Sequence, residues 1–395
     1  MLRKGLPLEA ALDVAARDLE RADDRGFAHA IAAEALRRLP DLDALIDGAT
    51  KQRLPDDAKA RSALRIALVQ ALALGTPPHA AISTVLPLVD GGPRRLVHGV
   101  FGTLMRRNAA LREPPTLPPP VAERWRAAWG EAVVEAAARL ISVPPPLDLI
   151  GVPPAEEGVT FAPDHLRLAR GTSVAGLTGY GEGHWWVQDI SASIPARLLG
   201  PGEGRSALDL CAAPGGKTLQ LAKAGFCVTA VDVSGDRLGR LRENLDRTGL
   251  QAEVAAADVM AWQPSEHADA VLLDAPCSAT GIYRRHPDVL HRVRPRAIAE
   301  LAGVQQAMLA RSAEWAKRGG GILVYSVCSL EPEEGESVAE AFLASRIDYE
   351  TVPIDAAELP AGIEPTPQGW LRILPGALEA EGGADSFFIA RFRRR

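Results

Sequence analysis

The sequence predicts an α/β protein in which an all-helical segment precedes a mainly parallel sheet covered by helices. From about residue 205 onward, short apolar runs rich in β-branched residues alternate with helical stretches, a pattern typical of βαβ units. Before that point, apolar residues recur at helical spacing, as at Leu64, Leu68 and Leu72. The chain has 395 residues, more than one hydrophobic core usually supports, so we expect two or three domains.

Proline-rich stretches mark the expected domain boundaries. The segment EPPTLPPP at residues 113–120 lacks backbone donors and favours extended geometry over helix, which predicts a linker. One amphipathic helix is predicted over residues 121–141, and VPPPLDLIGVPP ends it. We therefore expect an all-α domain over residues 1–112, a proline-rich linker with a small helical bridging subdomain over 113–187, and a catalytic sheet domain over 188–395.

Composition and charge exclude several classes of protein. With 47% hydrophobic and 24% charged residues, the chain is neither disordered nor collagen-like. Its net charge of −6 excludes a general coat for nucleic acid, although the first 110 residues carry 16 Lys and Arg against 13 Asp and Glu. The four cysteines form no disulfide framework, the histidines lack ligand spacing, and no apolar run reaches the roughly 18 residues of a membrane span. We expect a cytoplasmic protein with no membrane or metal partner.

Six apolar runs are the predicted strands. Five of them belong to the parallel part of the sheet and a sixth closes the chain: SALDL, CVTAVDV, AEVAAAD, DAVLLDA and GILVYSV, followed by SFFIARF. Parallel sheets of this kind bind ligands at the carboxyl ends of their strands. The residues that follow each run are therefore the first candidates for a functional site.

A glycine-rich turn, CAAPGGKT, joins the first of these strands to the next helix. Gly215 and Gly216 allow close backbone approach, and the helix start offers unpaired N–H groups and a positive dipole end. This pattern favours a ligand that carries a carboxylate or another anion. A tight turn that only packs helix on strand is the alternative, because the segment matches neither a Walker loop nor GxGxxG.

Acidic residues end four successive predicted strands: Asp209, Asp232, Asp258 and Asp274. Asp232 lies 23 residues after Asp209, close to the offset at which an acid reaches a ribose hydroxyl in nucleotide-binding βαβ units. Asp258 is placed to accept a hydrogen bond from an adenine amino group. Solvated loops are a poor explanation for four acids in this arrangement.

Two cysteines follow the fourth and fifth strands, Cys277 in DAPC and Cys328 in YSVC. We interpret Cys227, inside a strand, as a small buried hydrophobe. Thiols beside a nucleotide-like cofactor suggest covalent catalysis on a pyrimidine, because cytosine C5 is a poor nucleophile until another nucleophile adds at C6. This reasoning alone does not choose between the two cysteines.

Together the motifs resemble the NOL1/NOP2/Sun group of RNA (cytosine-5) methyltransferases. The segments that carry the resemblance are LDLCAAPGGKT, DVSGDRLGRLRENLDRTG, LLDAPCSATG with RRHPD, and YSVCSLEPEEGE, within residues 188–395. The N-terminal helices are similar to the NusB-like domain of bacterial 16S rRNA methyltransferases through LRIALVQAL, PPHAAISTVLPLV and RLVHGVFGTLMRR. The resemblance implies a Rossmann-like, S-adenosylmethionine-dependent methyltransferase domain preceded by an all-α NusB-like domain.

The resemblance also implies a role for each site residue. Cys328 is the implied nucleophile, Cys277 helps to release the enzyme after methyl transfer, Asp274 binds the cytosine edge, and Lys217 lies near the cofactor carboxylate or the target nucleotide. The implied S-adenosylmethionine site comprises Cys211, Ala212, Ala213, Pro214, Gly215, Gly216, Lys217, Asp232, Arg237, Asp258 and Asp274.

Basic residues after the fourth strand are the expected RNA contacts. Arg284, Arg285 and His286 lie in RRHPD, at the start of an arginine cluster that continues to Arg296. A solvated surface is the alternative, and the terminal arginines from Arg391 to Arg395 are equally typical of a solubilising tail. We expect a monomer that acts on RNA, 16S rRNA above all. A catalytically lapsed RNA-binding assembly factor and a tRNA cytosine-5 methyltransferase remain the alternatives.

Overall fold

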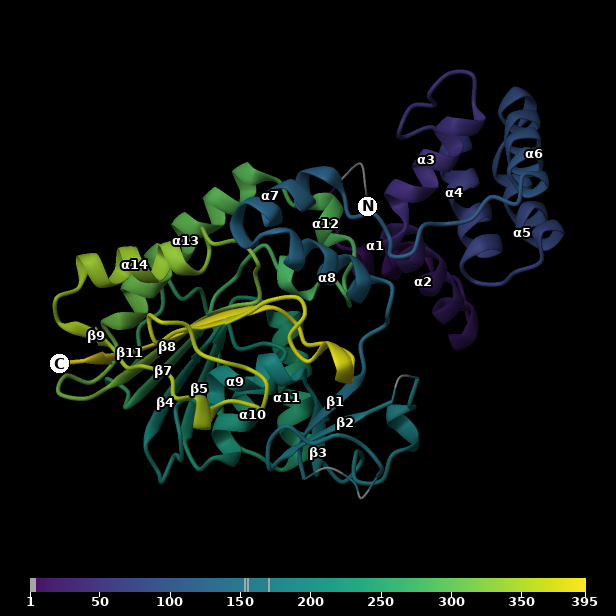
Figure 1. The fold of residues 1–395 in the computed structure, drawn as a ribbon. Coiled ribbons are helices and arrows are strands. Elements are labelled where there is room, and N and C mark those ends of the chain that lie inside the picture. The colour runs from purple at the N-terminus through teal and green to yellow at the C-terminus, as the bar shows by residue number, and fades with distance from the viewer. Residues whose placement is uncertain (1–4, 153, 155, 170) are drawn as a thin grey trace. The chain divides into compact units, whose positions relative to one another are not determined.

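The computed structural model describes residues 5–152, 154, 156–169 and 171–395 (Figure 1). It divides into two compact units. The first comprises Met1–Val143 with Tyr283–Arg292, and the second comprises Pro144–Ile282 with Val293–Arg395. No helix in the described ranges is long and apolar enough to cross a membrane.

The first unit consists of helices, several of which pack around α4 (Lys59–Leu72), which confirms the predicted all-helical segment. Leu64 and Leu68 of α4 are fully buried together with Leu42 of α3 (Leu39–Ala49) and Val97 of α6 (Gly91–Arg106). The other helices of this unit are α1 (Leu8–Ala15), α2 (Ala22–Arg37), α5 (Pro78–Val85), η1 (Leu86–Leu88), α7 (Pro119–Trp129), α8 (Glu131–Ile141) and α12 (Val289–Arg292).

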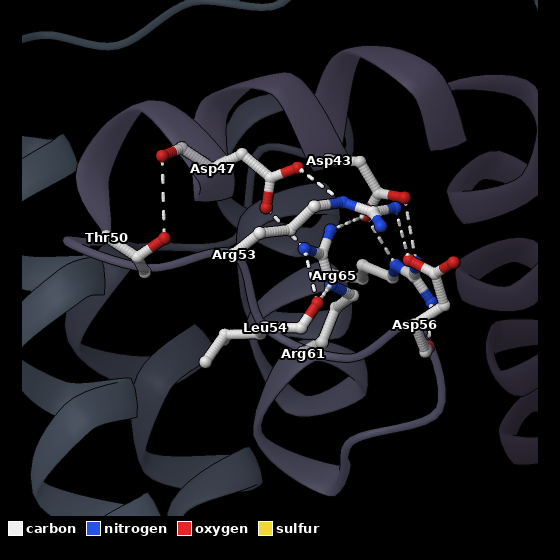
Figure 2. Close-up of polar contacts among 8 residues, drawn as sticks. All are labelled: Asp43, Asp47, Thr50, Arg53, Leu54, Asp56, Arg61 and Arg65. Atoms are coloured by element: carbon white, nitrogen blue, oxygen red, sulfur yellow. Dashed lines mark hydrogen bonds and ion pairs between the residues drawn. The ribbon is translucent and has the colours of Figure 1, made fainter.

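A buried arginine fixes the connection between α3 and α4 (Figure 2). The guanidinium of Arg61 has no exposed surface, forms ion pairs with Asp43 (3.0 Å) and Asp47, and donates from Nε to the Leu54 carbonyl oxygen at 3.0 Å. Arg65, one turn later on α4, makes a two-pronged bond to the same Asp43 at 2.7 and 2.8 Å. These bonds compensate the desolvation of the Arg61 charge.

The prediction of one helix over residues 121–141 is wrong. The chain forms α7 and α8, separated by Gly130, whose φ of 83° lies outside the helical region. Trp125 of α7 is buried against the ring of Tyr283, with ring centroids 5.5 Å apart. An amphipathic pattern that continues across a single glycine therefore conceals a sharp change of direction.

The large sheet of the second unit has the strand order β10-β11-β8-β7-β4-β5-β6, with β9 beside β11. The strands β4 to β8 pair in parallel, and β11 is antiparallel to β8. This arrangement confirms the predicted Rossmann-like fold and all six predicted strands. The strands of the large sheet are β4 (Ser206–Leu210), β5 (Cys227–Asp232), β6 (Glu253–Ala256), β7 (Ala270–Asp274), β8 (Ile322–Val327), β9 (Tyr349–Thr351), β10 (Leu371–Ile373) and β11 (Phe387–Arg394), of which β9 and β10 were not predicted.

Helices cover both faces of this sheet (Figure 1). In β7, Val271 and Leu273 face α13 (Pro295–Ala313) and α14 (Glu336–Ser345), whereas Ala270 and Leu272 face α9 (Ile190–Arg197) and α10 (Gly216–Lys223). Both sets are buried, because successive side chains of a strand point to opposite faces. The remaining elements are α11 (Gly235–Thr248), η2 (Val174–Gly176), η3 (Thr280–Ile282), η4 (Ala356–Glu358) and η5 (Glu379–Glu381).

A small antiparallel sheet that the sequence did not predict precedes the large one. It has the order β2-β1-β3, from β1 (Leu147–Gly151), β2 (His165–Leu168) and β3 (Trp185–Val187). Buried Arg167 binds Asp148 at 2.6 and 2.8 Å and donates to the Gly383 carbonyl oxygen at 2.8 Å. Burial acts to raise the pKa of Asp148, but Arg167 and His165 outweigh it and hold this pKa well below its usual range.

Two further expectations about single residues are wrong. Cys227 is exposed rather than buried, because it is the first residue of β5. The terminal arginines do not form a free tail, since Arg391, Arg393 and Arg394 belong to β11 and Arg395 forms an ion pair with Glu350 at 3.0 Å. Arg391 is buried and binds Glu358 at 2.7 Å, and buried Arg394 donates to the Ala316 carbonyl oxygen at 2.8 Å.

Candidate active site at the carboxyl ends of the strands

The site is assembled where parallel strands end next to one another. Asp232 ends β5 and Asp274 ends β7, and the two strands lie on either side of β4. In the register of β7 and β8, Asp274 is level with Ser326, so the segments that carry Cys277 and Cys328 leave the sheet at the same edge. Asp232 and Cys328, 96 positions apart in the sequence, therefore lie at the same edge of the sheet.

The glycine-rich turn after β4 has the left-handed backbone that a glycine allows at Gly215, and also at Cys211, where the sequence did not predict it. Cys211 has a φ of 61° and Gly215 a φ of 108°, and α10 begins at Gly216. A Cβ atom at Gly215 would lie 2.9 Å from Leu241 Cγ, so a larger residue there would be both strained and crowded. The turn thus presents the free N–H groups of the first turn of α10 next to small side chains.

Asp232 and Arg237 hold the same turn from the neighbouring strand. One Asp232 oxygen accepts from the Ala213 N–H at 3.1 Å and the other accepts from the Ser234 N–H at 2.9 Å. Arg237 lies 3.6 Å from Asp232 and donates to the Ala213 carbonyl oxygen. Asp258 follows β6, is exposed, and accepts from the Met260 N–H at 2.9 Å. Carboxylates therefore stand at the ends of β5 and β6.

These residues fit S-adenosylmethionine, the cofactor that the sequence resemblance implies. The N–H groups at the start of α10 suit a carboxylate, and Asp232 supplies an acceptor at the strand end where a ribose hydroxyl is bound in nucleotide-binding folds. Ala212 and Ala213 are buried small side chains beside this acceptor. The fit rests on the backbone of the turn and on the acids at the strand ends.

Lys217 and Asp274 form the polar centre of the site. Lys217 Nζ lies 2.8 Å from one Asp274 oxygen, and Ser326 Oγ donates to the other at 2.8 Å. The Lys217 side chain is 11% exposed and that of Asp274 is 29% exposed. Burial acts to lower the pKa of Lys217, but Asp274 outweighs this effect and raises it, so the ammonium stays charged. Both oxygens of Asp274 are thus held in a fixed orientation.

The two candidate cysteines face each other. Cys277 Sγ lies 3.5 Å from Cys328 Sγ, within hydrogen-bond distance for sulfur, and both residues are half-buried. The hydrogen bond to Cys328 and burial raise the pKa of Cys277 well above its usual value, so this thiol is protonated at neutral pH. The Lys217 ammonium interacts electrostatically with Cys328. The structure therefore brings together Cys277, Cys328, Asp274 and Lys217.

Burial sets the protonation of two further groups beneath the glycine-rich turn. Asp209 is fully buried, and burial raises its pKa to about 7 even though Thr218 Oγ1 donates to it at 2.5 Å. Burial and then the charge of Asp274 raise the pKa of Cys211 to about 12. Cys211 is therefore a thiol at neutral pH and a poor nucleophile.

One buried residue beside the two cysteines was not among the residues that the sequence predicted. Glu334 is fully buried and accepts hydrogen bonds from the residues that directly follow both cysteines, Ser278 and Ser329. In the sequence it is one of three acids in EPEE, and an exposed acidic loop would look the same. Only the three-dimensional structure reveals its burial, because its hydrogen-bond partners come from two loops that are far apart in the chain.

The expected RNA-binding residues lie in the first unit. Arg37 donates to the Arg284 carbonyl oxygen at 3.2 Å, and His291 donates to the Leu36 carbonyl oxygen at 2.8 Å. Arg284 is 1% exposed, whereas Arg285 and His286 are half-buried. Burial lowers the pKa of His286. In the described ranges, no group of three or more His, Cys, Asp or Glu side chains is placed to hold a metal ion.

Known protein families match both the N-terminal helices and the sheet domain of this chain. A family profile described as "16S rRNA methyltransferase RsmB/F" matches residues 196–393, and the NusB family profile matches residues 1–95. Ribosomal RNA small subunit methyltransferase B of Xylella fastidiosa strain 9a5c is 36% identical over 98% of this chain and 96% of its own. The protein of the same name from Klebsiella pneumoniae strain MGH 78578 is 43% identical over 60% of this chain and 54% of its own.

Solved structures share the fold. The crystal structure of PH0851 aligns with a TM-score of 0.75 at 22% identity, over 95% of this chain and 92% of that one. A methyltransferase homologue from Pyrococcus horikoshii aligns with a TM-score of 0.56 at 25% identity, over 74% and 98% of the two chains. With the sequence matches, these results show that the chain belongs to the RsmB/F family of 16S rRNA methyltransferases, with a NusB-family domain at its N-terminus and S-adenosylmethionine as cofactor.

Proposed function

We propose that this protein methylates C5 of a cytidine in 16S rRNA and that Cys328 is the nucleophile. The observation that carries the proposal is the pair of facing thiols, 3.5 Å apart, beside the Lys217 to Asp274 ion pair. Methylation of an exocyclic amine would need no thiol, whereas C5 of cytosine becomes nucleophilic only after another nucleophile adds at C6. The family membership supports the RNA substrate, and the thiols support the carbon that is methylated.

Cofactor binding is assigned to the glycine-rich turn and the following acids. The proposed contacts are the N–H groups at the start of α10 for the carboxylate, Asp232 for the ribose and Asp258 for the adenine. Arg237 holds the turn in place through the Ala213 carbonyl oxygen. S-adenosylmethionine supplies an electrophilic methyl group when it is bound. The turn would hold the cofactor at the same edge of the sheet at which β7 and β8 end.

In the proposed reaction, the two cysteines have different protonation states. The Cys328 sulfur, as thiolate, adds to C6 of the cytosine, and the displaced electron pair makes C5 nucleophilic. Asp274, held by Lys217 and Ser326, binds the polar edge of the base. After methyl transfer, a base takes the C5 proton, the electron pair re-forms the C5–C6 double bond, and the C6–S bond breaks to release the Cys328 thiolate. The protonated Cys277 stabilises that leaving sulfur through a hydrogen bond.

RNA recognition is assigned partly to the first unit. We propose that Arg285 and His286 contact the RNA, while buried Arg284 holds their segment against the helices of that unit. Guanidinium groups hold phosphates in register without reading sequence. The NusB-family domain is the second proposed RNA-binding element. We place the reaction in the cytoplasm and expect a monomer.

Bisulfite sequencing tests the proposed function. Unmethylated 16S rRNA and tRNA are incubated with S-adenosylmethionine and either the wild-type protein or Cys328→Ala. The proposal expects one or a few protected cytidines in 16S rRNA with the wild-type protein and none with Cys328→Ala. Methyl groups found only on other atoms would overturn the choice of C5, protection only in tRNA would overturn the substrate, and full activity of Cys328→Ala would overturn the nucleophile.

A further inference from the structure

The carboxylate of Glu334 connects the two loops that carry the cysteines. Its Oε1 accepts from the Ser278 N–H at 2.8 Å, and its Oε2 accepts from the Ser278 and Ser329 hydroxyls, each at 2.5 Å. Ser278 directly follows Cys277, and Ser329 directly follows Cys328. One side chain thus holds the residue after each thiol.

Further bonds fix Glu334 itself. Gln305 of α13 donates to Glu334 Oε1 at 3.1 Å and to the Pro276 carbonyl oxygen at 2.9 Å. Tyr325 of β8 donates to the Glu334 carbonyl oxygen at 2.5 Å. Gln305 and Tyr325 are fully buried, as is Glu334. The carboxylate therefore has little freedom to move without displacing one of the two loops.

A second set of bonds joins the same loops independently. The Gly281 N–H donates to the Cys328 carbonyl oxygen at 3.0 Å, and the Leu330 N–H donates to Thr280 Oγ1 at 3.0 Å. The loops would consequently stay near each other if the Glu334 charge were removed. The charge of Glu334 can therefore be removed by substitution while the second set of bonds keeps the loops together.

A carboxylate is an expensive group to bury, and each donor that reaches its oxygens is neutral: a backbone N–H, two hydroxyls and an amide. A glutamine would fill the same space, and both hydroxyls are able to rotate and accept a hydrogen bond. The hydrogen-bond geometry alone does not require a negative charge. What distinguishes glutamate from glutamine here is the charge beside the Cys277 loop.

We propose that Glu334 is a positioning residue whose carboxylate sets the separation of the two thiols and whose charge acts on the Cys277 side of the pair. This inference rests on the proposed function, because it assigns the thiolate to Cys328 and the proton to Cys277. The charge of Glu334 adds to the effects of the Cys328 hydrogen bond and burial, which raise the pKa of Cys277. The other titratable groups around the thiol pair are Tyr325, Asp274, Lys217 and Arg372.

The test compares Glu334→Gln with Glu333→Gln in the full-length protein. Glu333 is the neighbouring, exposed acid, so its variant loses the same charge from the same loop. The pH dependence of alkylation by iodoacetamide is measured at Cys277 by mass spectrometry of its peptide. We expect the midpoint to fall by about one pH unit in Glu334→Gln, the scale on which a neighbouring charge shifts a pKa, and to match the wild type in Glu333→Gln.

The kinetic readout separates positioning from substrate binding. In Glu334→Gln, kcat for methyl transfer is expected to fall about tenfold with an unchanged KM for RNA. An amide makes longer and weaker hydrogen bonds to the Ser278 and Ser329 hydroxyls than a carboxylate does, so the two loops shift, and reacting groups are sensitive to small displacements. Equal alkylation midpoints in Glu334→Gln and Glu333→Gln would overturn the proposal. Alkylation needs neither RNA nor cofactor, so this failure is distinct from activity in Cys328→Ala, which would overturn the proposed function.

A second variant keeps the proposal testable if Glu334→Gln does not fold. Ser329→Ala removes one hydrogen bond from Glu334 and leaves its charge in place. We expect kcat to fall about fivefold and the alkylation midpoint of Cys277 to stay at the wild-type value. Wild-type kcat in Ser329→Ala would overturn the positioning role.

Discussion

The sulfur atoms of Cys277 and Cys328 lie 3.5 Å apart although 51 positions separate the two residues in the chain. The contact follows from the topology, because β7 and β8 are adjacent parallel strands, and Cys277 and Cys328 come three residues and one residue after their ends. The two thiols belong to one site, but their surroundings differ: burial and the hydrogen bond to Cys328 keep Cys277 protonated, whereas Cys328 interacts with the Lys217 ammonium. Their variants should therefore fail in different ways.

Cys277→Ala is predicted to accumulate a covalent complex with RNA, because release of the Cys328 sulfur loses its hydrogen-bond donor. Cys328→Ala is predicted to form no complex and to transfer no methyl group. Denaturing gel electrophoresis with labelled 16S rRNA measures both. Cys227→Ala is the matched control, since that exposed thiol lies at the start of β5. A complex that forms equally in all three variants would contradict the assignment.

Gly215→Ala is predicted to weaken S-adenosylmethionine binding about tenfold, which corresponds to ~1.4 kcal/mol. The residue has a φ of 108°, and a Cβ atom would lie 2.9 Å from Leu241 Cγ, so the turn must shift. Isothermal titration calorimetry measures the affinity. Gly235→Ala at the start of α11 meets no atom within 4 Å and serves as the control. Equal affinities for the two variants would count against the proposed role of the turn.

Protonated Asp209 is predicted to stabilise the folded protein at low pH, and this contribution is lost as pH rises. Burial raises its folded-state pKa to about 7, whereas an unfolded aspartate titrates near ~3.9. The folded state therefore holds the extra proton between these values, and its stabilising effect is lost as pH rises through about 7. The loss amounts to roughly 4 kcal/mol for a shift of this size.

Asp209→Asn should remove this pH dependence. Thermal unfolding of the wild type and the variant at pH 5 and pH 8 measures it, and the variant is expected to lose less stability than the wild type between the two values. Equal losses of stability between pH 5 and pH 8 in both proteins would show that Asp209 is not the group responsible.

Asp148→Ala is predicted to destabilise the second unit by about 3–5 kcal/mol, because it leaves the buried Arg167 charge without its partner. Arg296→Ala is the control, since Arg296 and Glu300 form an ion pair with side chains 90% and 62% exposed. That change should cost less than about 1 kcal/mol. Denaturant unfolding followed by tryptophan fluorescence compares the two, and equal losses would refute the structural role of Asp148.

The sequence predicted the central strands because each is a short apolar run with a turn or an acid at its end. Asp232 and Asp274 were placed correctly at the ends of β5 and β7, since strand ends are local features. The break at Gly130 was missed because an amphipathic pattern continues on both sides of it. The strands β1, β2 and β3 were missed because they are short and surrounded by proline and glycine.

Features that depend on distant parts of the chain were beyond sequence reasoning. Nothing local distinguishes buried Glu334 from exposed Glu333, because the difference arises from Ser278 and Gln305 elsewhere in the chain. Arg391 was likewise interpreted as part of a tail, yet it is buried against Glu358. A charged residue reveals its role only when its partner is known.

Peptide mapping of a trapped complex tests the central claim most directly. 16S rRNA that contains 5-fluorocytidine is incubated with the wild-type protein and S-adenosylmethionine, because fluorine at C5 prevents the loss that would release the enzyme. After digestion, mass spectrometry identifies the cysteine that carries the nucleotide. The nucleotide is predicted on the peptide with Cys328. A nucleotide on the peptide with Cys277, or no trapped complex at all, would contradict the assignment of Cys328 as the nucleophile.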